Sequence, residues 1–305
     1  MSAKHSKNFI LLFLTALIWG VAFVAQSVAM DYIGPYTFNA VRSLLGGIVL
    51  VPCVVLFGQK KKAVKDGDPA KGTSIDRPGD VITGGLLCGI MLFLSTTLQQ
   101  VGIQYTTVAK AGFITALYII LVPILGIFLK KRVSFQIWIS VVIAIIGLYL
   151  LCMKGSFYLG QGDFLMLVCS LCFALHILVI DRFTDKVSGV KLSCIQFFVC
   201  GLLSCVLMFL FEKPDVSDIL SAWLPIVYAG VFSSGVAYTL QIIGQKGTDP
   251  TIASLILSLE SVVSVLAGWI ILGQSLTPRE ILGCLLMFGA IILAQVAPDQ
   301  KAASS

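Results

Sequence analysis

Apolar stretches of about twenty residues recur along this chain, separated by shorter segments rich in charged or turn-forming residues. A helix that crosses a hydrocarbon core of about 30 Å needs about 20 mainly apolar residues. The pattern therefore predicts ten crossings. They span residues 8–30, 36–57, 81–103, 107–129, 134–152, 161–180, 192–211, 222–243, 250–272 and 279–297.

The continuous apolar character of these stretches predicts helices rather than barrel strands, which would alternate apolar with polar residues. Composition points the same way, because 12% of the 305 residues are charged, 58% are hydrophobic and the mean hydropathy is +0.99. A water-soluble domain carries roughly a quarter charged residues. We therefore expect an all-α integral membrane protein with ten transmembrane helices.

The basic residues indicate orientation. With a cytoplasmic N-terminus, sixteen of the 21 lysines and arginines fall on the cytoplasmic side of the predicted membrane. Lys154, Lys213 and Arg279 fall on the other side, and Arg42 and Lys110 lie at or within spans. Cytoplasmic loops of membrane proteins carry an excess of basic residues, so both termini are predicted to be cytoplasmic. The net charge of +6 is explained by this topology, and no nucleic-acid partner is predicted.

A weak internal repeat relates the two halves of the chain. The segment 98–102 (LQQVG) recurs as 240–244 (LQIIG), and the same offset of 142 relates Gly147 to Gly289. Other matches have slightly different offsets. They align Ala22, Phe23 and Gln26 with Cys172, Phe173 and His176, and Arg42 and Gly47 with Gln196 and Gly201.

The repeat predicts two five-helix units of opposite orientation. Five spans per unit is an odd number, so the second unit must enter the membrane from the opposite face. We expect the first unit to comprise residues 1–155, with a mobile cytoplasmic loop over 58–80. The second comprises residues 156–305, with a short C-terminal tail. Inverted repeats of this kind are typical of secondary transporters that bind solute near the membrane midplane.

Several segments resemble a known family. Residues 113–118 (FITALY), followed by 121–123 (LVP) and 130–132 (KKR), resemble the fourth helix of the drug/metabolite transporter superfamily, in its ten-helix EamA branch. Residues 18–23 (IWGVAF) and 258–261 (SLES), with Leu282, Gly283 and Gly289, extend the resemblance over nearly the whole chain. The resemblance implies a secondary carrier for metabolites such as amino acids or drug-like solutes, usually an exporter, in the cell membrane, here a bacterial inner membrane.

Polar and aromatic side chains inside the spans are the candidate site residues, because burying them in lipid is costly. The candidates for the substrate cavity are Trp19, Gln26, Gln99, Gln100, Tyr118, His176, Tyr238 and Gln241. Glu260 is a candidate for proton coupling or a structural hydrogen-bonding group. Arg42 either binds a substrate carboxylate or is structural. For His176 a structural hydrogen bond is the alternative.

Other functions remain open at this stage. A receptor or scaffold without transport would also suit the composition, although it would not require the repeat. An intramembrane enzyme is disfavoured, since the chain has two histidines and lacks a clustered nucleophile and base. No cofactor and no metal site are predicted. The expected partners are membrane lipids, a small-molecule substrate and protons as a coupling ion, and a homodimer is compatible with the sequence.

Overall fold

The computed structural model describes residues 3–65, 76–106, 108–131, 133–152, 160–272 and 277–296. Within these ranges the regular elements are helices. They are α1 (Ala3–Ala29), α2 (Pro35–Lys65), α3 (Pro78–Ile103), α4 (Val108–Ala116), α5 (Tyr118–Phe128), α6 (Phe135–Cys152), α7 (Gln161–Phe183), α8 (Gly189–Phe211), α9 (Val216–Ser221), α10 (Trp223–Val227), the π-helix η1 (Tyr228–Ala237), α11 (Tyr238–Gln245), α12 (Pro250–Leu257), α13 (Leu259–Leu272) and α14 (Pro278–Val296).

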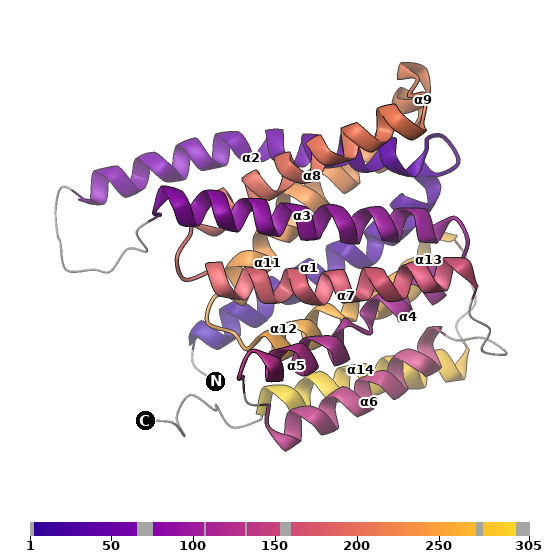
Figure 1. The fold of residues 1–305 in the computed structure, drawn as a ribbon. Helices are drawn as coiled ribbons and strands as arrows, with labels where there is room; N and C mark the ends of the chain where they lie inside the picture. The colour runs from indigo at the N-terminus through magenta and orange to yellow at the C-terminus, as the bar shows by residue number, and fades with distance from the viewer. Residues whose placement is uncertain are drawn as a thin grey trace.

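These helices form ten passes across the molecule, which confirms the predicted fold class. Nine of the described helical stretches are long and apolar enough to cross a membrane, and the shorter apolar helix 135–151 supplies the tenth pass. Successive passes alternate in direction, so α1 begins and α14 ends at the same end of the bundle, on the left in Figure 1.

Three of the predicted spans are interrupted in the structure. The span predicted at 107–129 divides into α4 and α5 at Leu117, and the span at 250–272 divides into α12 and α13 at Ser258. The span at 222–243 is built from α10, η1 and α11 in succession. A π-helix of ten residues is unusual, because most π-helical segments are single-turn bulges, often at functional sites.

The predicted loop 58–80 is partly wrong. Helix α2 continues to Lys65, and α3 begins at Pro78. Residues 59–65 are Gln, Lys, Ala and Val, of which Gln, Lys and Ala favour helix, so the backbone continues beyond the apolar part of α2. Residues 66–75 of the loop, the predicted boundary between residues 155 and 156, and the tail from residue 297 lie outside the described residues.

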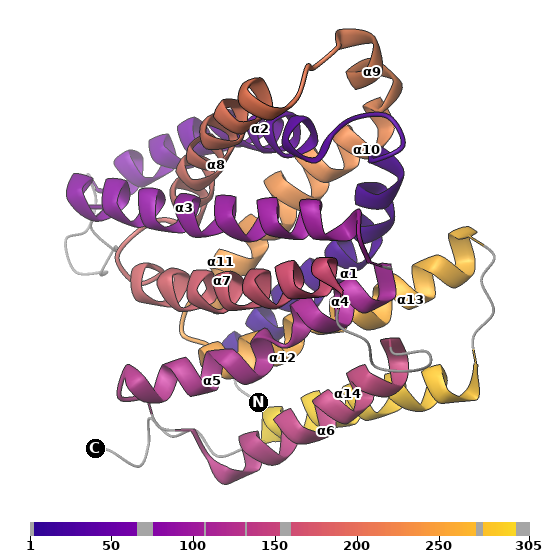
Figure 2. The same cartoon turned by 45° about the vertical axis from the view of Figure 1, so that its right-hand side comes forward.

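The packing of the helices follows a twofold relation between the halves. Helix α2 packs on α8 and α6 packs on α14, which pairs each helix with its counterpart, as Figures 1 and 2 show at opposite edges of the bundle. Helix α3 packs on α7. In the same way η1 and α11, the counterparts of α3, pack on α1, the counterpart of α7. Helix α13 packs on α1, and its counterparts in the first half, α4 and α5, pack on α7. The inverted repeat predicted from the sequence is therefore present in the packing.

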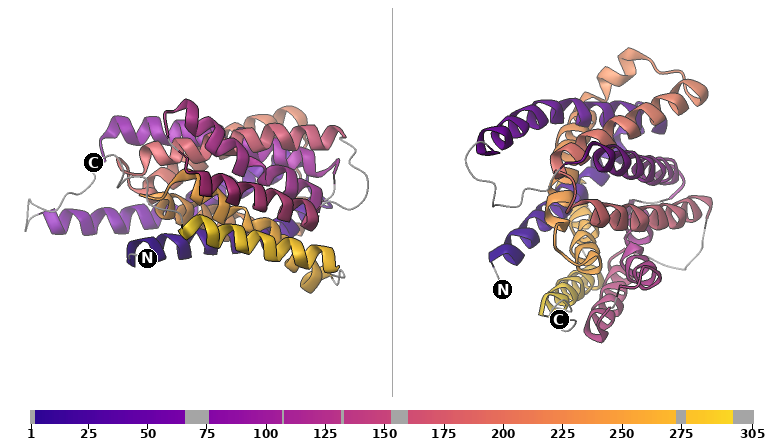
Figure 3. Two further views of the ribbon diagram at one scale, coloured as in Figure 1. Left: turned by 90° about the horizontal axis from the view of Figure 1, so that it is seen from below. Right: turned by 60° about the vertical axis from the view of Figure 1, so that its left-hand side comes forward.

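Helices α6 and α14 cross at a close approach between two glycines, and they lie side by side away from the other passes in the right panel of Figure 3. A Cβ atom at Gly283 would lie 2.7 Å from the carbonyl oxygen of Gly147 and 2.8 Å from the backbone nitrogen of Leu151. The sequence repeat matched Gly289 to Gly147, but a Cβ atom at Gly289 would have no neighbouring heavy atom within 4 Å. The contact in this crossing is therefore made by Gly283 rather than Gly289.

We expect Gly283→Ala to destabilise the protein by about 1–3 kcal/mol, because the added methyl group meets backbone atoms that cannot rotate away. Thermal unfolding of the purified protein in detergent measures this change. Gly289→Ala is the matched control on the same helix and should leave the unfolding temperature unchanged, since the space around it is open. Equal unfolding temperatures for the two variants would contradict the crossing.

The predicted orientation can be tested with single cysteines introduced into a variant that lacks the native ones. Ser217, in α9, and Lys246, after α11, are both exposed and lie at opposite ends of the bundle. In intact cells a membrane-impermeant thiol reagent should label Ser217→Cys, whereas Lys246→Cys should react only after permeabilisation. The reverse labelling pattern would place the termini outside the cytoplasm.

Candidate functional site

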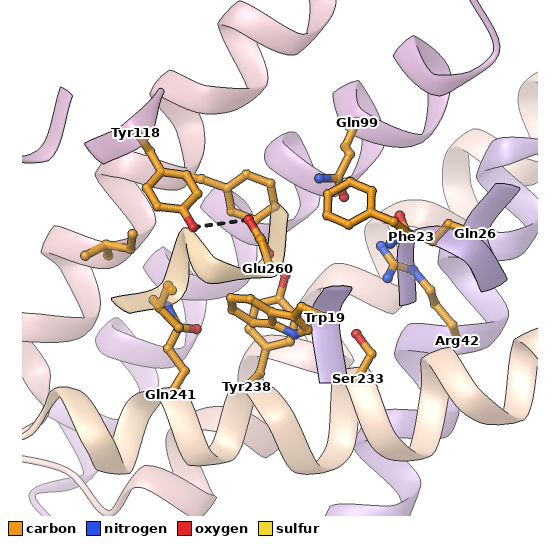
Figure 4. Close-up of a pocket in the computed structure, with 13 residues that line it drawn as sticks. Trp19, Phe23, Gln26, Arg42, Gln99, Tyr118, Ser233, Tyr238, Gln241 and Glu260 are labelled. Carbon is orange, nitrogen blue, oxygen red and sulfur yellow. Dashed lines mark hydrogen bonds between the residues drawn. The ribbon is translucent and has the colours of Figure 1, made fainter. Parts of the chain in front are cut away.

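A central cavity lies among the passes, with its wall drawn from both halves of the chain (Figure 4). Its wall comprises Trp19, Phe23 and Gln26 of α1, Arg42 of α2, Gln99 of α3, Tyr118 of α5, Phe173 and Ile177 of α7, Ser233 of η1, Tyr238 and Gln241 of α11, Leu257 of α12 and Glu260 of α13. The cavity offers about 30 Å³ to the centres of water molecules. One water occupies a probe volume of about 10–15 Å³, so the cavity is on the scale of a few waters.

Eight of the ten candidate residues contribute to this wall, namely Trp19, Gln26, Arg42, Gln99, Tyr118, Tyr238, Gln241 and Glu260. The other two, Gln100 and His176, are fully buried behind it. The Nε2 atom of Gln100 donates to the backbone oxygen of Gln26 at 3.3 Å, which ties α3 to α1. The Nε2 atom of His176 lies 3.1 Å from Oε1 of Gln196, which ties α7 to α8.

Five wall residues were not among the candidates: Phe23, Phe173, Ile177, Ser233 and Leu257. The repeat carried a signal for two of them. It aligned Phe23 with Phe173, and the structure places both rings on the cavity wall. The remaining three are ordinary residues for a membrane helix, and nothing in their local sequence separates them from lipid-facing neighbours.

The two interrupted helices position the polar contact at the centre of the cavity. Tyr118 is the first residue of α5 and Glu260 the second residue of α13, directly after the interruptions at Leu117 and Ser258. The hydroxyl of Tyr118 donates to Oε1 of Glu260 at 3.1 Å, drawn as a dashed line in Figure 4. The two residues are 142 positions apart, which is the offset of the repeat. The contact thus joins equivalent positions of the two halves.

Local hydrogen bonds account for the interruption between α12 and α13. The Oγ atom of Ser258 donates to the backbone oxygen of Leu255 at 2.7 Å, and the amide of Ser261 donates to the oxygen of Ser258 at 3.1 Å. Hydroxyls that bond a carbonyl one turn earlier bend helices. In the first half, the amide of Leu117 donates to the oxygen of Ile114 at 3.2 Å, a tight turn that ends α4. The backbone is thereby redirected at both places beside the cavity.

Arg42 is buried within the membrane-spanning part of α2, with 3% of its surface exposed. Its Nε donates to Oδ1 of Asn39 at 2.9 Å, and its guanidinium lies 5.3 Å from the centre of the Phe38 ring. Among the described residues it forms no ion pair, and its Nη2 atom is buried with no hydrogen-bond partner. A buried cation without a carboxylate partner is costly, and Nη2 of Arg42 is available for a hydrogen bond on the cavity wall.

Several other polar atoms of the wall are buried without a partner. They are Nε1 of Trp19, Oε1 of Gln26 and Oε1 of Gln241. Buried polar atoms are nearly always hydrogen-bonded, and leaving one unpaired costs about 1–3 kcal/mol. Together with Nη2 of Arg42, these atoms give the cavity both donors and acceptors for a polar solute or bound water.

Aromatic rings hold the wall in place. The rings of Trp19 and Tyr238 lie 4.5 Å apart between centroids, and Tyr238 also contacts Phe197 and His176 at 5.2 Å and 6.0 Å. Such pairs contribute about 0.5–1.5 kcal/mol beyond their buried area. His176 thus supports the cavity through Tyr238 instead of lining it.

No group of three or more His, Cys, Asp or Glu that could hold a metal occurs in the part of the chain that the structure describes.

The sequence profile of the EamA-like transporter family matches residues 6–153 and, separately, residues 160–295. The chain belongs to the EamA-like transporter family. This EamA-like protein is a multi-pass membrane transporter, in agreement with its resemblance to the drug/metabolite transporter superfamily. The first matched stretch contains nearly all of α1 and all of α2 to α6, and the second runs from the start of α7 to nearly the end of α14.

Relatives along the whole chain support this assignment. An uncharacterized transporter of Archaeoglobus fulgidus is 31% identical over 285 residues, which cover 93% of this chain and 84% of that protein. The uncharacterized transporter YwfM of Bacillus subtilis is 25% identical and covers 96% of this chain and 95% of its own. The uncharacterized inner membrane transporter YedA of Escherichia coli is 23% identical, with coverage of 92% and 88%.

A solved crystal structure has the same fold. It superposes with a TM-score of 0.77 and covers 98% of this chain and 99% of its own. At 19% sequence identity this likeness concerns the fold alone.

We expect Tyr118→Phe to destabilise the EamA-like protein by about 1–3 kcal/mol, because the carboxyl of Glu260 loses its hydrogen-bond donor while remaining buried. Thermal unfolding in detergent measures the change. Tyr149→Phe is the matched control, since Tyr149 lies on α6, is 42% exposed and has its hydroxyl in no hydrogen bond with the described residues. A loss of stability as large in Tyr149→Phe would show that the contact with Glu260 is not its cause.

Proposed function

We propose that the protein is a secondary carrier that moves a small metabolite bearing a carboxylate, such as an amino acid, across the membrane by alternating access. The observation that carries this proposal is the cavity between the two halves, in which the unpartnered Nη2 of Arg42 and the carboxyl of Glu260 occur on different passes. Figure 4 shows the guanidinium at one end of the group of side chains and Tyr118 at the other, with Glu260 between them.

The size of the cavity supports alternating access. A space on the scale of a few waters is too small for a metabolite, whose binding site is typically a cavity of about 300–1,000 Å³. Solute entry therefore requires the passes around the cavity to separate. Two inverted halves provide two related packings, one open to each side, and exchange between them carries the solute across.

The wall chemistry supports a carboxylated solute. A guanidinium presents a planar set of donors that matches a carboxylate in bidentate fashion. The amides of Gln26, Gln99 and Gln241 add uncharged contacts, which bind weakly enough to allow release. Drug-like solutes remain the alternative substrate class, which the aromatic rings of Trp19 and Tyr238 would favour. The direction that we propose is export, which the family resemblance supports. The membrane that we propose is a bacterial inner membrane, which the name of the relative, the uncharacterized inner membrane transporter YedA, supports.

The competing functions find less support. A receptor or scaffold has no need for unpartnered donors and acceptors around an internal cavity. An intramembrane enzyme needs a nucleophile activated by a base. Here the hydroxyl of Tyr118 is bonded to Glu260, and Ser233 shows no bond to a histidine within the described part of the chain. Membership in a transporter family favours the carrier over both.

Reconstitution into liposomes and counterflow against a panel of metabolites tests the proposal. Amino acids should exchange, and the amines that lack only the carboxylate should exchange far more slowly. We expect Arg42→Gln to lower exchange of the carboxylated solutes about 10- to 100-fold, the loss of one charged hydrogen-bonding contact of about 1.5–3 kcal/mol. Arg279→Gln, an exposed arginine outside the cavity, is the matched control. No exchange of any solute would overturn the carrier proposal.

Glu260 is our candidate for proton coupling, and Glu260→Gln tests it because glutamine keeps the shape of the side chain and removes the titratable group. The unaltered protein should accelerate uptake when a pH gradient is imposed across the liposome membrane. In Glu260→Gln, exchange without a gradient should persist while the acceleration disappears. A variant that still responds fully to the gradient would assign Glu260 a structural role.

A further inference from the structure

A second pocket opens at the end of the bundle where α3 begins and α7 ends, on the left in Figure 1. It offers about 610 Å³ to the centres of water molecules, far more than the central cavity. Its wall includes Arg77 at the start of α3, together with Arg182 of α7 and Lys186 just beyond it. None of its residues lines the central cavity. The transport site therefore does not explain it.

The charge around this pocket is positive. Three cations, Arg77, Arg182 and Lys186, share the wall with a single carboxylate, Asp80. All three basic side chains belong to exposed residues, and none forms an ion pair with a described residue.

Two carboxylates close to these cations in the sequence are already engaged elsewhere. Asp76 accepts from Nζ of Lys191 at 2.8 Å and from the amide of Ser188 at 2.7 Å. Asp181 is paired with Lys131. Asp185 is the other acidic residue near Lys186 in the sequence, and it lies outside the pocket wall. The pocket thus presents an excess of unpaired positive charge.

The inner part of the same pocket is apolar. Leu87 of α3 and Val179 and Phe183 of α7 form it, and Leu87 is 42% exposed. The ammonium of Lys186 lies 5.9 Å from the centre of the Phe183 ring, so the basic rim directly adjoins the apolar wall. Because α3 and α7 are long and apolar enough to span a membrane and the pocket lies where α3 begins and α7 ends, we expect this boundary to fall where headgroups meet acyl chains.

We propose that this pocket binds the headgroup of an anionic phospholipid, with the phosphate among Arg77, Arg182 and Lys186 and the start of the acyl chains against Leu87 and Phe183. Basic pockets between transmembrane helices are a recognised form of anionic-lipid site. A soluble phosphate compound would use the cations but would leave the apolar wall uncovered. The position of the pocket and its two-part chemistry therefore favour a lipid.

Native mass spectrometry of the purified full-length protein in detergent tests the proposal. The probes are phosphatidylglycerol and phosphatidylcholine with identical acyl chains, so that the two lipids differ only in the headgroup, which is anionic in the first and zwitterionic in the second. We expect phosphatidylglycerol to bind more tightly. The double variant Arg182→Gln with Lys186→Gln should bind it about 30-fold more weakly, since each basic side chain near a membrane surface contributes about 1 kcal/mol. Both residues are exposed, so the double variant should fold as the unaltered protein does, and thermal unfolding checks this point.

The matched control, Lys213→Gln with Lys246→Gln, removes the same charge from exposed sites outside the pocket and should bind phosphatidylglycerol normally. Equal weakening in both double variants, or none in either, would overturn the proposal. Displacement of the lipid by millimolar inorganic phosphate or glycerol 3-phosphate would overturn the lipid assignment in favour of a soluble ligand. The readout is binding, so its result does not depend on whether the protein carries the proposed metabolite.

Discussion

Within a bilayer, a backbone N–H or C=O group must find its hydrogen-bond partner inside the protein, because lipid offers none. Uninterrupted helices meet this requirement by themselves. Helices that break inside the membrane do so only where other groups replace the missing bonds, as the hydroxyl of Ser258 does for the oxygen of Leu255. The breaks at Leu117 and Ser258 therefore carry a cost that the rest of the bundle has to offset, and both lie beside the central cavity.

The same requirement governs the polar side chains. Those inside the spans turn toward the interface between the halves, where some satisfy one another and others do not. The repeat-related pairs behave differently in this respect. His176 and Gln196 bond to each other behind the cavity wall, although Nδ1 of His176 and Nε2 of Gln196 have no partner. Their counterparts Gln26 and Arg42 keep their unpartnered atoms on the wall itself. At these matched positions, the pair in the second half supports the wall from behind, and the pair in the first half faces the cavity.

The positions of the passes could be predicted because hydropathy over twenty residues is a strong signal in this chain. The interruptions could not, since Leu117 and Ser258 sit within apolar stretches whose average hydropathy hides a local turn. The polar candidate residues could be identified because each one stands out as a polar side chain within an apolar stretch. The direction in which each of these side chains points was harder to predict from the sequence. Gln99 and Gln100 are neighbours on one helix and point about 100° apart, so only Gln99 reaches the cavity. Phe23 and Ile177 were missed because an apolar wall residue looks the same in sequence as a lipid-facing one.

Tyr118 and Glu260 occupy equivalent places in the two halves, yet one is a phenol and the other a carboxylic acid. If the two halves were identical in sequence, an inward-open and an outward-open arrangement would have equal free energies. Here the donor belongs to one half and the acceptor to the other, so the two arrangements place unlike groups in the corresponding surroundings. In the proposed alternating-access cycle, the two arrangements of the empty carrier would therefore differ in free energy, and chemical divergence at this matched pair is one source of the difference.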